Sequence, residues 1–268
     1  DVLSRGYGRQ GKGIERVAVD AIDAARRFGD EPALIAHRTG VPVWVGAKRF
    51  RVGQTAEAGW ALHQRGVHLL DDGFQHARLE RAFDVVLVTA EDLEDALLPA
   101  GNLREGLRAL RRAEAVVVRE DELEAVKARV WALMPQGAQM WVVRRRLEFP
   151  APLFVFGAGL RPVAFCGIAR PEGFAAMLQA NGCGVVETVA FGDHRAYTAA
   201  DVNKIVEVAR GLKATGFVTT EKDAVKLSAG MRGQLEEVGP VMVVALEAEF
   251  ADPGAVVRAL EAKLGARA

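Results

Sequence analysis

Short runs of β-branched and other apolar residues alternate with longer stretches of helical spacing along most of the chain. In the first half, the runs that predict strands of one sheet are residues 41–45, 67–70, 85–88 and 115–118. The stretches with helical spacing and length are residues 31–38, 52–64 and 121–133. Strands and helices in alternation are typical of a parallel sheet with helices on both faces, so the pattern predicts an α/β protein.

A connector separates this region from a second one with the same alternation. Residues 140–145, with the prolines and glycines of 150–159 after them, predict a β-ribbon linker. Beyond it the predicted strands are 162–166, 185–190, 216–219 and 241–246, and the predicted helices are 172–179, 200–209 and 253–264. The simplest architecture has a parallel-sheet core domain over residues 1–148. A second, smaller α/β domain follows over 149–268, and its last helix is a candidate to return to the first domain.

Composition narrows the class of protein. The chain has 268 residues, of which 50% are hydrophobic, and this apolar fraction excludes a disordered chain. Its 35 basic and 35 acidic residues cancel, so there is no global attraction to nucleic acid, and an anionic partner must be bound by a local patch. Two cysteines, Cys166 and Cys183, make neither a disulfide framework nor a zinc set, and we expect buried thiols in a reducing cytosol. No apolar run approaches the roughly 18–20 residues of a membrane-spanning helix.

Paired carboxylates follow the predicted strand 67–70. In open α/β sheets ligands bind beyond the carboxyl ends of the strands. Asp71 and Asp72 stand at such an end, as the acidic residues of a Walker-B element do when they hold Mg²⁺. Two adjacent aspartates repel each other unless a cation or hydrogen-bond donors compensate them. The alternative is a turn that ends the strand, and spacing alone weighs the two equally.

Three further polar stretches have both a structural and a functional interpretation. Asp30 is either the N-cap of a helix or a carboxylate that accepts a proton from a substrate hydroxyl. His194 lies in a cluster of polar residues after a predicted strand, where a structural and a functional role are equally favoured. Residues 219–223 read as a capped helix start with a solvated run of charges, or as part of a site.

Basic stretches supply candidate phosphate ligands. Arg49 and Arg104 each lie in a short polar stretch, and the planar guanidinium matches phosphate oxygens. Each stretch could equally be a solvated helix face. Arg108, Arg111 and Arg112 alternate with leucines, a weak pattern for contact with an anionic membrane surface.

Seven motifs follow one another along the chain. The first four are Ser4-Arg5-Gly6-Tyr7-Gly8, Gly29-Asp30-Glu31-Pro32, Asp71-Asp72-Gly73-Phe74-Gln75-His76 and Leu98-Pro99-Ala100-Gly101-Asn102-Leu103-Arg104-Glu105. The others are Ala164-Phe165-Cys166-Gly167-Ile168-Ala169-Arg170-Pro171, Asp193-His194-Arg195-Ala196-Tyr197 and Thr220-Glu221-Lys222-Asp223-Ala224-Val225-Lys226. Taken in this order, the motifs resemble the tetraacyldisaccharide 4′-kinase family of the lipid A pathway, over residues 1 to about 250.

The resemblance implies a P-loop-kinase-like core and a reaction. Members transfer the γ-phosphoryl group of ATP, with Mg²⁺, to the 4′-hydroxyl of an acylated glucosamine disaccharide 1-phosphate. They do so as peripheral proteins at the cytoplasmic face of the bacterial inner membrane. The expected partners are therefore that substrate and an anionic membrane surface, and no nucleic acid.

The resemblance also implies roles for individual residues. Asp30 would be the base for the acceptor hydroxyl, and His194 would orient it. Asp71, Asp72 and Glu31 would serve the metal. The residues expected to line the substrate or phosphate site are Arg5, Tyr7, Arg49, Gln75, His76, Arg104 and Glu105.

One family feature is missing from these 268 residues. Nothing matches the phosphate-binding pattern G-x-x-x-x-G-K-[ST], whose backbone N–H groups and lysine hold the β- and γ-phosphates. We therefore expect a fragment of a longer gene that has no turnover alone, and the alternative is a member that has lost catalysis. Two other classes remain open: another P-loop-fold small-molecule kinase, and a non-catalytic module that binds acylated, phosphorylated sugars.

Overall fold

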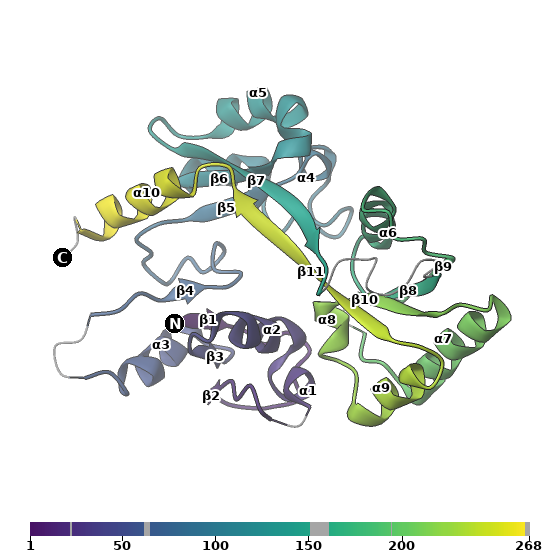
Figure 1. Cartoon of the computed structure of the whole chain (residues 1–268). Coiled ribbons are helices and arrows are strands. Elements are labelled where there is room, and N and C mark those ends of the chain that lie inside the picture. The colour runs from purple at the N-terminus through teal and green to yellow at the C-terminus, as the bar shows by residue number, and fades with distance from the viewer. Residues whose placement is uncertain (22, 62–64, 151–160, 194, 266–268) are drawn as a thin grey trace. The chain divides into compact units, whose positions relative to one another are not determined.

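A computed structural model describes residues 1–21, 23–61, 65–150, 161–193 and 195–265 (Figure 1). It divides into two compact units, and unit 1 consists of Asp1–Asp72 and Leu147–Leu246. Unit 2 consists of Gly73–Arg146 and Glu247–Ala268. The expected pair of domains, divided after residue 148, stays a prediction about which segments fold independently.

Unit 1 begins with a four-stranded sheet of order β2-β3-β1-β4. Its strands are β1 (Val2–Ser4), β2 (Glu15–Arg16), β3 (Val43–Val45) and β4 (Leu69–Leu70). β1 pairs in parallel with β3 and β4, and β2 is an antiparallel edge strand. Helices α1 (Ala24–Phe28) and α2 (Asp30–Thr39) pack on one face, and α3 (Arg49–Glu57) packs on the other. Successive residues of a strand point to opposite faces, and apolar residues of β1 and β3 pack against helices on both faces of this sheet.

The rest of unit 1 is a parallel array in the order β11-β10-β8-β9. Its strands are β8 (Pro162–Cys166), β9 (Glu187–Ala190), β10 (Gly216–Thr220) and β11 (Val241–Phe250). Helices α7 (Ala199–Gly211) and α9 (Ala229–Glu236) pack on the face that carries Phe165 and Phe217. Helix α6 (Pro171–Ala180) packs on the opposite face, and α8 (Glu221–Ala224) directly follows β10. Cys166 and Cys183 are buried and free, as predicted.

Unit 2 contains the parallel strands β5 (Val85–Val88), β6 (Ala115–Arg119) and β7 (Gln139–Glu148). One face is covered by α4 (Ala90–Glu94), α5 (Leu123–Leu133) and the 3₁₀ helix η1 (Leu107–Arg112). A second 3₁₀ helix, η2 (Glu120–Glu122), leads into α5. Helix α10 (Pro253–Gly265) contributes Val256 to the core on the other face, beside Trp141. The full strand order is β5-β6-β7-β11-β10-β8-β9, with seven strands.

The predicted α/β class is confirmed, but the predicted single first sheet is wrong. The runs at 85–88 and 115–118 pair with each other in the seven-stranded sheet, whereas those at 41–45 and 67–70 pair with β1 in the four-stranded sheet. The apolar pattern locates strands but not their partners, because pairing joins residues far apart in sequence. β4 has only two residues and runs directly into a turn, where Asp72 has a φ of 54°.

Other predicted elements differ mainly in their bounds. The helix expected at 52–64 begins at Arg49 and ends at Glu57, and residues 62–64 lie outside the described part of the chain. The predicted linker strand 140–145 is longer, Gln139–Glu148, and residues 151–160 are not described. Short helices such as α1, α4 and α9 have too few residues for a periodic signal.

Within the described residues, no helix is both long enough and apolar enough to span a bilayer.

Candidate active site

Two glycines bring the loop after β1 against the start of α2. Gly6 has a φ of +66°, and a Cβ atom there would lie 2.6 Å from the carbonyl oxygen of Phe28. Gly29 has a φ of +101°, and its Cβ would lie 3.2 Å from both the Cα of Gly6 and the carbonyl oxygen of Tyr7. Only glycine combines this backbone conformation with so close an approach. The contact sets Asp30, the next residue, beside the loop.

Asp30 is not the N-cap that the sequence suggested. Gly29 holds that position, and Asp30 is the first helical residue, with 8% of its surface exposed. An N-cap carboxylate accepts the N–H of the second or third helical residue. Asp30 Oδ1 accepts instead the N–H of Glu31, at 3.0 Å, and Oδ2 lies 3.7 Å from the ammonium of Lys226. The structural interpretation of Asp30 as a cap is therefore wrong.

The paired aspartates follow β4 at the carboxyl edge of the four-stranded sheet. The hydroxyl of Ser4, at the end of β1, donates to Asp71 Oδ2 at 2.7 Å, and the N–H of Gly6 donates to the Ser4 hydroxyl at 3.3 Å. The backbone N–H of Asp71 donates to the carbonyl oxygen of Leu3 at 3.1 Å. One aspartate is thus held against the end of the neighbouring strand, and Asp72 follows it in the left-handed region.

Arg49 lies beside these aspartates and is buried, with 3% of its surface exposed. Its Nη1 donates to the carbonyl of Gly46 at 2.8 Å, and its Nη2 donates to the carbonyl of Asp71 at 3.3 Å. Burial lowers the pKa of Arg49, and the charges of Asp71 and Asp72 partly oppose that shift. Its Nε is buried and has no hydrogen-bond partner in the part of the chain that the structure describes. The alternative of a solvated helix face is wrong for this arginine.

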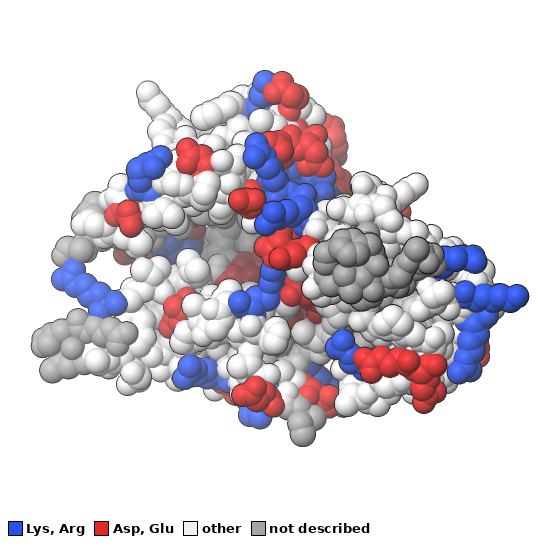
Figure 2. All heavy atoms as spheres, in the orientation of Figure 1, with Lys and Arg blue, Asp and Glu red and all other residues white. Residues whose placement is uncertain are grey.

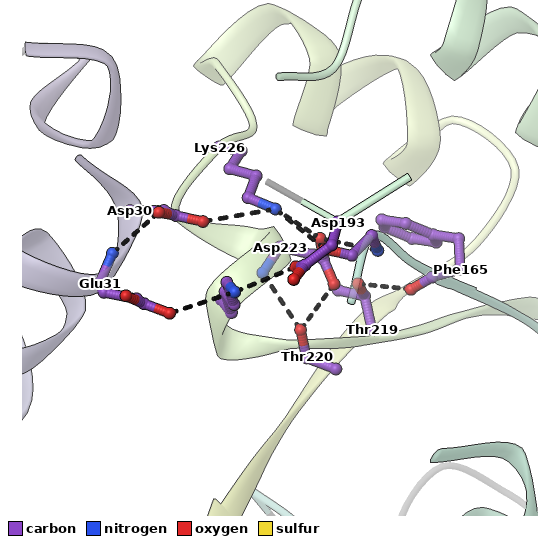
Figure 3. Close-up of polar contacts among 10 residues, drawn as sticks. Asp30, Glu31, Phe165, Asp193, Thr219, Thr220, Asp223 and Lys226 are labelled. Atoms are coloured by element: carbon purple, nitrogen blue, oxygen red, sulfur yellow. Dashed lines mark hydrogen bonds and ion pairs between the residues drawn. The ribbon is translucent and has the colours of Figure 1, made fainter. Parts of the chain in front are cut away.

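A buried lysine–aspartate pair lies at the start of α8 (Figure 3). Asp223 is fully buried, and its Oδ1 accepts the N–H of Gly167 at 3.0 Å and the ammonium of Lys226 at 3.1 Å. Its Oδ2 accepts the hydroxyl of Thr220 at 2.7 Å. The Lys226 ammonium also donates to the carbonyl of Gly167 at 3.3 Å, and it lies 3.7 Å from Asp30 Oδ2.

The predicted solvated run of charges at 219–223 is therefore wrong, although the predicted capped helix start is confirmed. Thr220 is the N-cap of α8, and its hydroxyl accepts the N–H of Asp223 at 3.1 Å.

A second lysine meets the neighbouring acidic residue. The Lys222 ammonium lies 3.3 Å from Glu31 Oε1 and 3.1 Å from Asp193 Oδ1. Burial alone would lower the pKa of Lys222. The hydrogen bond to Asp193 and the charges of Asp30 and Glu31 outweigh burial and raise it. His194 lies outside the described residues, so its role stays a prediction.

A cavity of about 440 Å³ in unit 1 gives Asp30 and Lys226 access to a ligand. Tyr7 and Tyr197 also line it. Tyr7 is exposed, whereas Tyr197 is buried, and burial together with the Asp223 carboxylate raises the pKa of its hydroxyl. The cavity is thus lined by residues that carry a carboxylate and an ammonium, whereas the hydroxyl of Tyr197 is itself buried. Arg5 lies on the same loop as Tyr7 and is exposed.

The remaining predicted site residues belong to unit 2. Glu105 forms an ion pair with Arg112, at 2.8 Å, and the guanidinium of Arg112 lies 4.6 Å from the ring centre of Phe74. Arg104 is exposed. The arginines that the sequence suggested for membrane contact lie in the six-residue η1, in which Leu110 is buried. Of these arginines, Arg112 is paired with Glu105 within unit 2.

Two residues that sequence reasoning missed shape these loops of unit 2. Asp95 Oδ2 accepts both the backbone and the side-chain N–H of Asn102, at 3.1 and 3.0 Å, and hydrogen bonds from Ala96 and Asn102 lower the pKa of Asp95. Arg81 donates to the carbonyl of His76 at 2.6 Å, so it holds the segment that carries Gln75 and His76. Gln75 is exposed and His76 is half-buried.

No three His, Cys, Asp or Glu side chains among the described residues gather into a group that could hold a metal ion. Mg²⁺ is usually bound by only one or two carboxylates, with water and substrate phosphates completing its shell. The paired aspartates beside Ser4 and Arg49 fit that limited role. Glu31 is already engaged by Lys222, and its assignment to the metal stays a prediction.

Sequence reasoning did not single out the two lysines as site residues. Both belong to one of the seven motifs, but Lys222 lies in α8 and Lys226 in the loop that follows it. The hydroxyl of Ser4 also lies in a motif, but nothing in its spacing predicted the bond to Asp71.

Carboxylates at the carboxyl edge of a parallel sheet, with a buried arginine beside them, are typical of the α/β kinases that transfer phosphoryl groups. Comparison with known proteins narrows this class. A family model described as "Tetraacyldisaccharide-1-P 4'-kinase" matches residues 1–265, and the chain belongs to this family.

Individual relatives agree with that assignment. The tetraacyldisaccharide 4′-kinase of Koribacter versatilis is 38% identical over 277 residues, which cover 99% of this chain and 80% of the relative. That of Rhodospirillum rubrum is 39% identical over 241 residues, covering 88% of this chain and 69% of the relative. The crystal structure of the "apo" form of LpxK from Aquifex aeolicus in complex with ATP matches with a TM-score of 0.71 and 27% identity. The match covers 98% of this chain and 78% of that one.

Proposed function

We propose that this chain carries the acceptor side of the 4′-kinase reaction of its family. In that reaction the 4′-oxygen of an acylated glucosamine disaccharide 1-phosphate attacks the γ-phosphorus of ATP. An O–P bond forms, the bond from the γ-phosphorus to the bridging oxygen breaks, ADP leaves, and the hydroxyl proton passes to a base. The observation that carries the proposal is the Asp30 carboxylate, which lines a cavity and is not a helix cap.

Asp30 is the proposed base. Its side chain is nearly buried but lines a cavity of about 440 Å³, which is within the usual range for small-molecule sites of roughly 300–1,000 Å³. A positioned carboxylate can take the proton of a hydroxyl within hydrogen-bond reach. His194 is the proposed partner that orients the same hydroxyl, and Tyr7 and Arg5 lie on the loop beside Asp30.

The phosphate side is assigned to the edge of the four-stranded sheet. Asp71, Asp72 and Glu31 are the proposed ligands of Mg²⁺. When bound, the metal would offset the negative charge of the transferred phosphoryl group. Arg49, with its unpartnered Nε in the described part of the chain, is the proposed contact to phosphate oxygens. The proposed substrate contacts in unit 2 are Gln75, His76, Arg104 and Glu105. The 268 residues supply no G-x-x-x-x-G-K-[ST] cradle for ATP.

An acylated substrate lies at a membrane, so we also propose that the protein acts as a peripheral protein at the cytoplasmic face of the inner membrane. On the face in Figure 2, basic and acidic side chains are interspersed and leave much neutral surface. Contact with anionic lipid would therefore use a local patch. Arg108 and Arg111 of η1 are the candidates, because Arg112 is paired with Glu105.

The test is a double-mutant cycle in the protein made from the complete open reading frame that encodes these residues. Asp30→Asn and His194→Gln should each lower kcat by about 10²–10⁴-fold, the usual contribution of a positioned acid–base group. KM for ATP should change little. If the two residues act as a unit, the double variant should be hardly slower than the poorer single variant.

Asp20→Asn is the matched control, because Asp20 is an exposed aspartate in the same part of unit 1. It should retain normal turnover. Normal kcat in Asp30→Asn would remove Asp30 from the chemistry. Binding of the disaccharide without any turnover by the wild-type protein would favour the non-catalytic binding module.

A further inference from the structure

We propose that Lys226, anchored by Asp223, is a positioning residue that orients the Asp30 carboxylate toward the acceptor hydroxyl. The inference rests on the proposed role of Asp30 as base. It assigns a role to a buried lysine of the loop after α8, which the proposed chemistry above does not use.

Three hydrogen bonds hold the Asp223 carboxylate in place. One oxygen accepts the backbone N–H of Gly167 and the Lys226 ammonium, and the other accepts the hydroxyl of Thr220. The residue is fully buried. A buried carboxylate is tolerated only when it is paired and hydrogen-bonded, so Asp223 depends on these partners. Lys226, with 5% of its side chain exposed, is held in place by its ion pair with Asp223.

Lys226 contacts both Asp223 and Asp30. Its ammonium lies 3.1 Å from Asp223 Oδ1 and 3.7 Å from Asp30 Oδ2. The other oxygen of Asp30 accepts the N–H of Glu31. The Asp30 carboxylate is therefore restrained at both oxygens, one by its own helix and one by the loop after α8 (Figure 3).

If Lys226 served only to neutralise Asp223, it would not need to lie beside Asp30 as well. Lys226 is three residues from Asp223 and could pair with it while pointing away from Asp30. Instead it lies between the two carboxylates at the wall of the cavity. Lys222, four residues earlier, meets Glu31 in the same way at 3.3 Å. Two lysines, Lys222 in α8 and Lys226 in the loop after it, thus contact the two consecutive acidic residues Glu31 and Asp30 at the start of α2.

Positioning matters for turnover because proton transfer and in-line attack depend steeply on geometry. A misplacement of about 1 Å can cost about 10²-fold in rate. Loss of Lys226 should therefore act on kcat while leaving the binding of ATP nearly unchanged.

The experiment separates positioning from stability. Lys226→Met alone leaves Asp223 buried without its ion-pair partner, so it should lower the melting temperature as well as kcat. The double variant Asp223→Asn/Lys226→Met removes both charges. The new amide can accept from Gly167 and donate to the Thr220 hydroxyl, so the double variant should regain most of the lost melting temperature.

In that stability-restored double variant kcat should still be at least 10-fold below wild type, with KM for ATP within about twofold. Lys226→Arg, which keeps the charge, should recover part of kcat. Val206→Ala is the control for stability, because Val206 is a core residue of α7 with 5% exposure. It should lower the melting temperature and leave kcat unchanged.

A second readout does not depend on activity. The Glu31 N–H donates to Asp30, so its hydrogen exchange reports whether the Asp30 carboxylate stays in place. Exchange at Glu31 should be at least threefold faster in the double variant and unchanged in Val206→Ala. A double variant with wild-type kcat and wild-type exchange at Glu31 would overturn the inference, and so would a loss of kcat that Val206→Ala reproduces. If Asp30→Asn has normal turnover, the proposed base is wrong, and the exchange at Glu31 still decides whether Lys226 positions Asp30.

Discussion

Replacement of Gly29 by alanine tests the contact that places Asp30. Gly29 precedes α2 with φ 101° and ψ 149°, a region that only glycine populates readily. Its Cα faces Gly6 and Tyr7, where an added methyl group would lie 3.2 Å from backbone atoms of both. Neither neighbour is the flexible end of a side chain, so the backbone at the start of α2 must move.

The expected loss of stability follows from these two terms. Forcing alanine into this conformation costs about 1–3 kcal/mol. The smaller entropy of the unfolded chain offsets about 0.4–1 kcal/mol of that cost. With the two tight contacts added, we expect a net loss of about 1–3 kcal/mol. At about 2–4 °C per kcal/mol, the melting temperature should fall by about 2–12 °C.

Gly40→Ala is the matched control at the other end of the same helix. Gly40 has a φ of 66°, and nothing lies within 4 Å of an added Cβ. Its substitution should cost about 0.5–1 kcal/mol, because the left-handed strain of about 1–2 kcal/mol is partly offset in the unfolded state.

The assay compares thermal unfolding and kcat for both variants. Gly29→Ala should lower kcat by about 10²-fold through displacement of Asp30, and Gly40→Ala should not change it. Equal kcat in the two variants would refute the reasoning that the Gly6–Gly29 contact positions Asp30.

Three further predictions concern other groups. Burial alone would raise the pKa of Asp201, but hydrogen bonds from Thr198 and the ion pair with Arg195 lower it. The stability that its carboxylate contributes is therefore fully present above the unfolded pKa of about 3.9. The difference in melting temperature between wild type and Asp201→Asn should shrink below that pH and be lost as the pH falls through the lowered pKa. Burial, with the nearby Asp223 charge, raises the pKa of Cys166 to about 12, so a thiol reagent at pH 8 should label it only after unfolding. Asp72→Ala should raise the Mg²⁺ concentration needed for half-maximal turnover at least 10-fold, whereas an unchanged requirement would exclude Asp72 as a metal ligand.

Local pattern was sufficient to find the strands but not the sheets. The runs at 85–88 and 162–166 were predicted to the residue, because β-branched and apolar side chains in short stretches have few other uses. The partner of each strand depends on contacts between distant residues. Nothing within 67–70 indicates that this run pairs with Val2 and Leu3.

The sequence was sufficient to choose candidate site residues but not to predict their contacts. Asp30 and Asp71 stood out because carboxylates at strand and helix ends are positioned for catalysis. Asp223 lies in the stretch 219–223, for which a solvated run of charges was one of two interpretations, because a run of charges at a helix start is usually exposed. Tertiary packing overrides that expectation here, since Asp223 lies beneath the backbone of Gly167. Arg49 was a candidate phosphate ligand, but its burial could not be inferred from a polar stretch.

The most direct test of the central claim is the position of the transferred phosphate. The protein made from the complete open reading frame would be incubated with γ-labelled ATP, Mg²⁺ and an acylated glucosamine disaccharide 1-phosphate, and the labelled oxygen would be identified by phosphorus–proton NMR. We predict label on the 4′-oxygen for wild type, and a rate about 10²–10⁴-fold lower for Asp30→Asn. Label on another oxygen, or an equal rate in Asp30→Asn, would contradict the account.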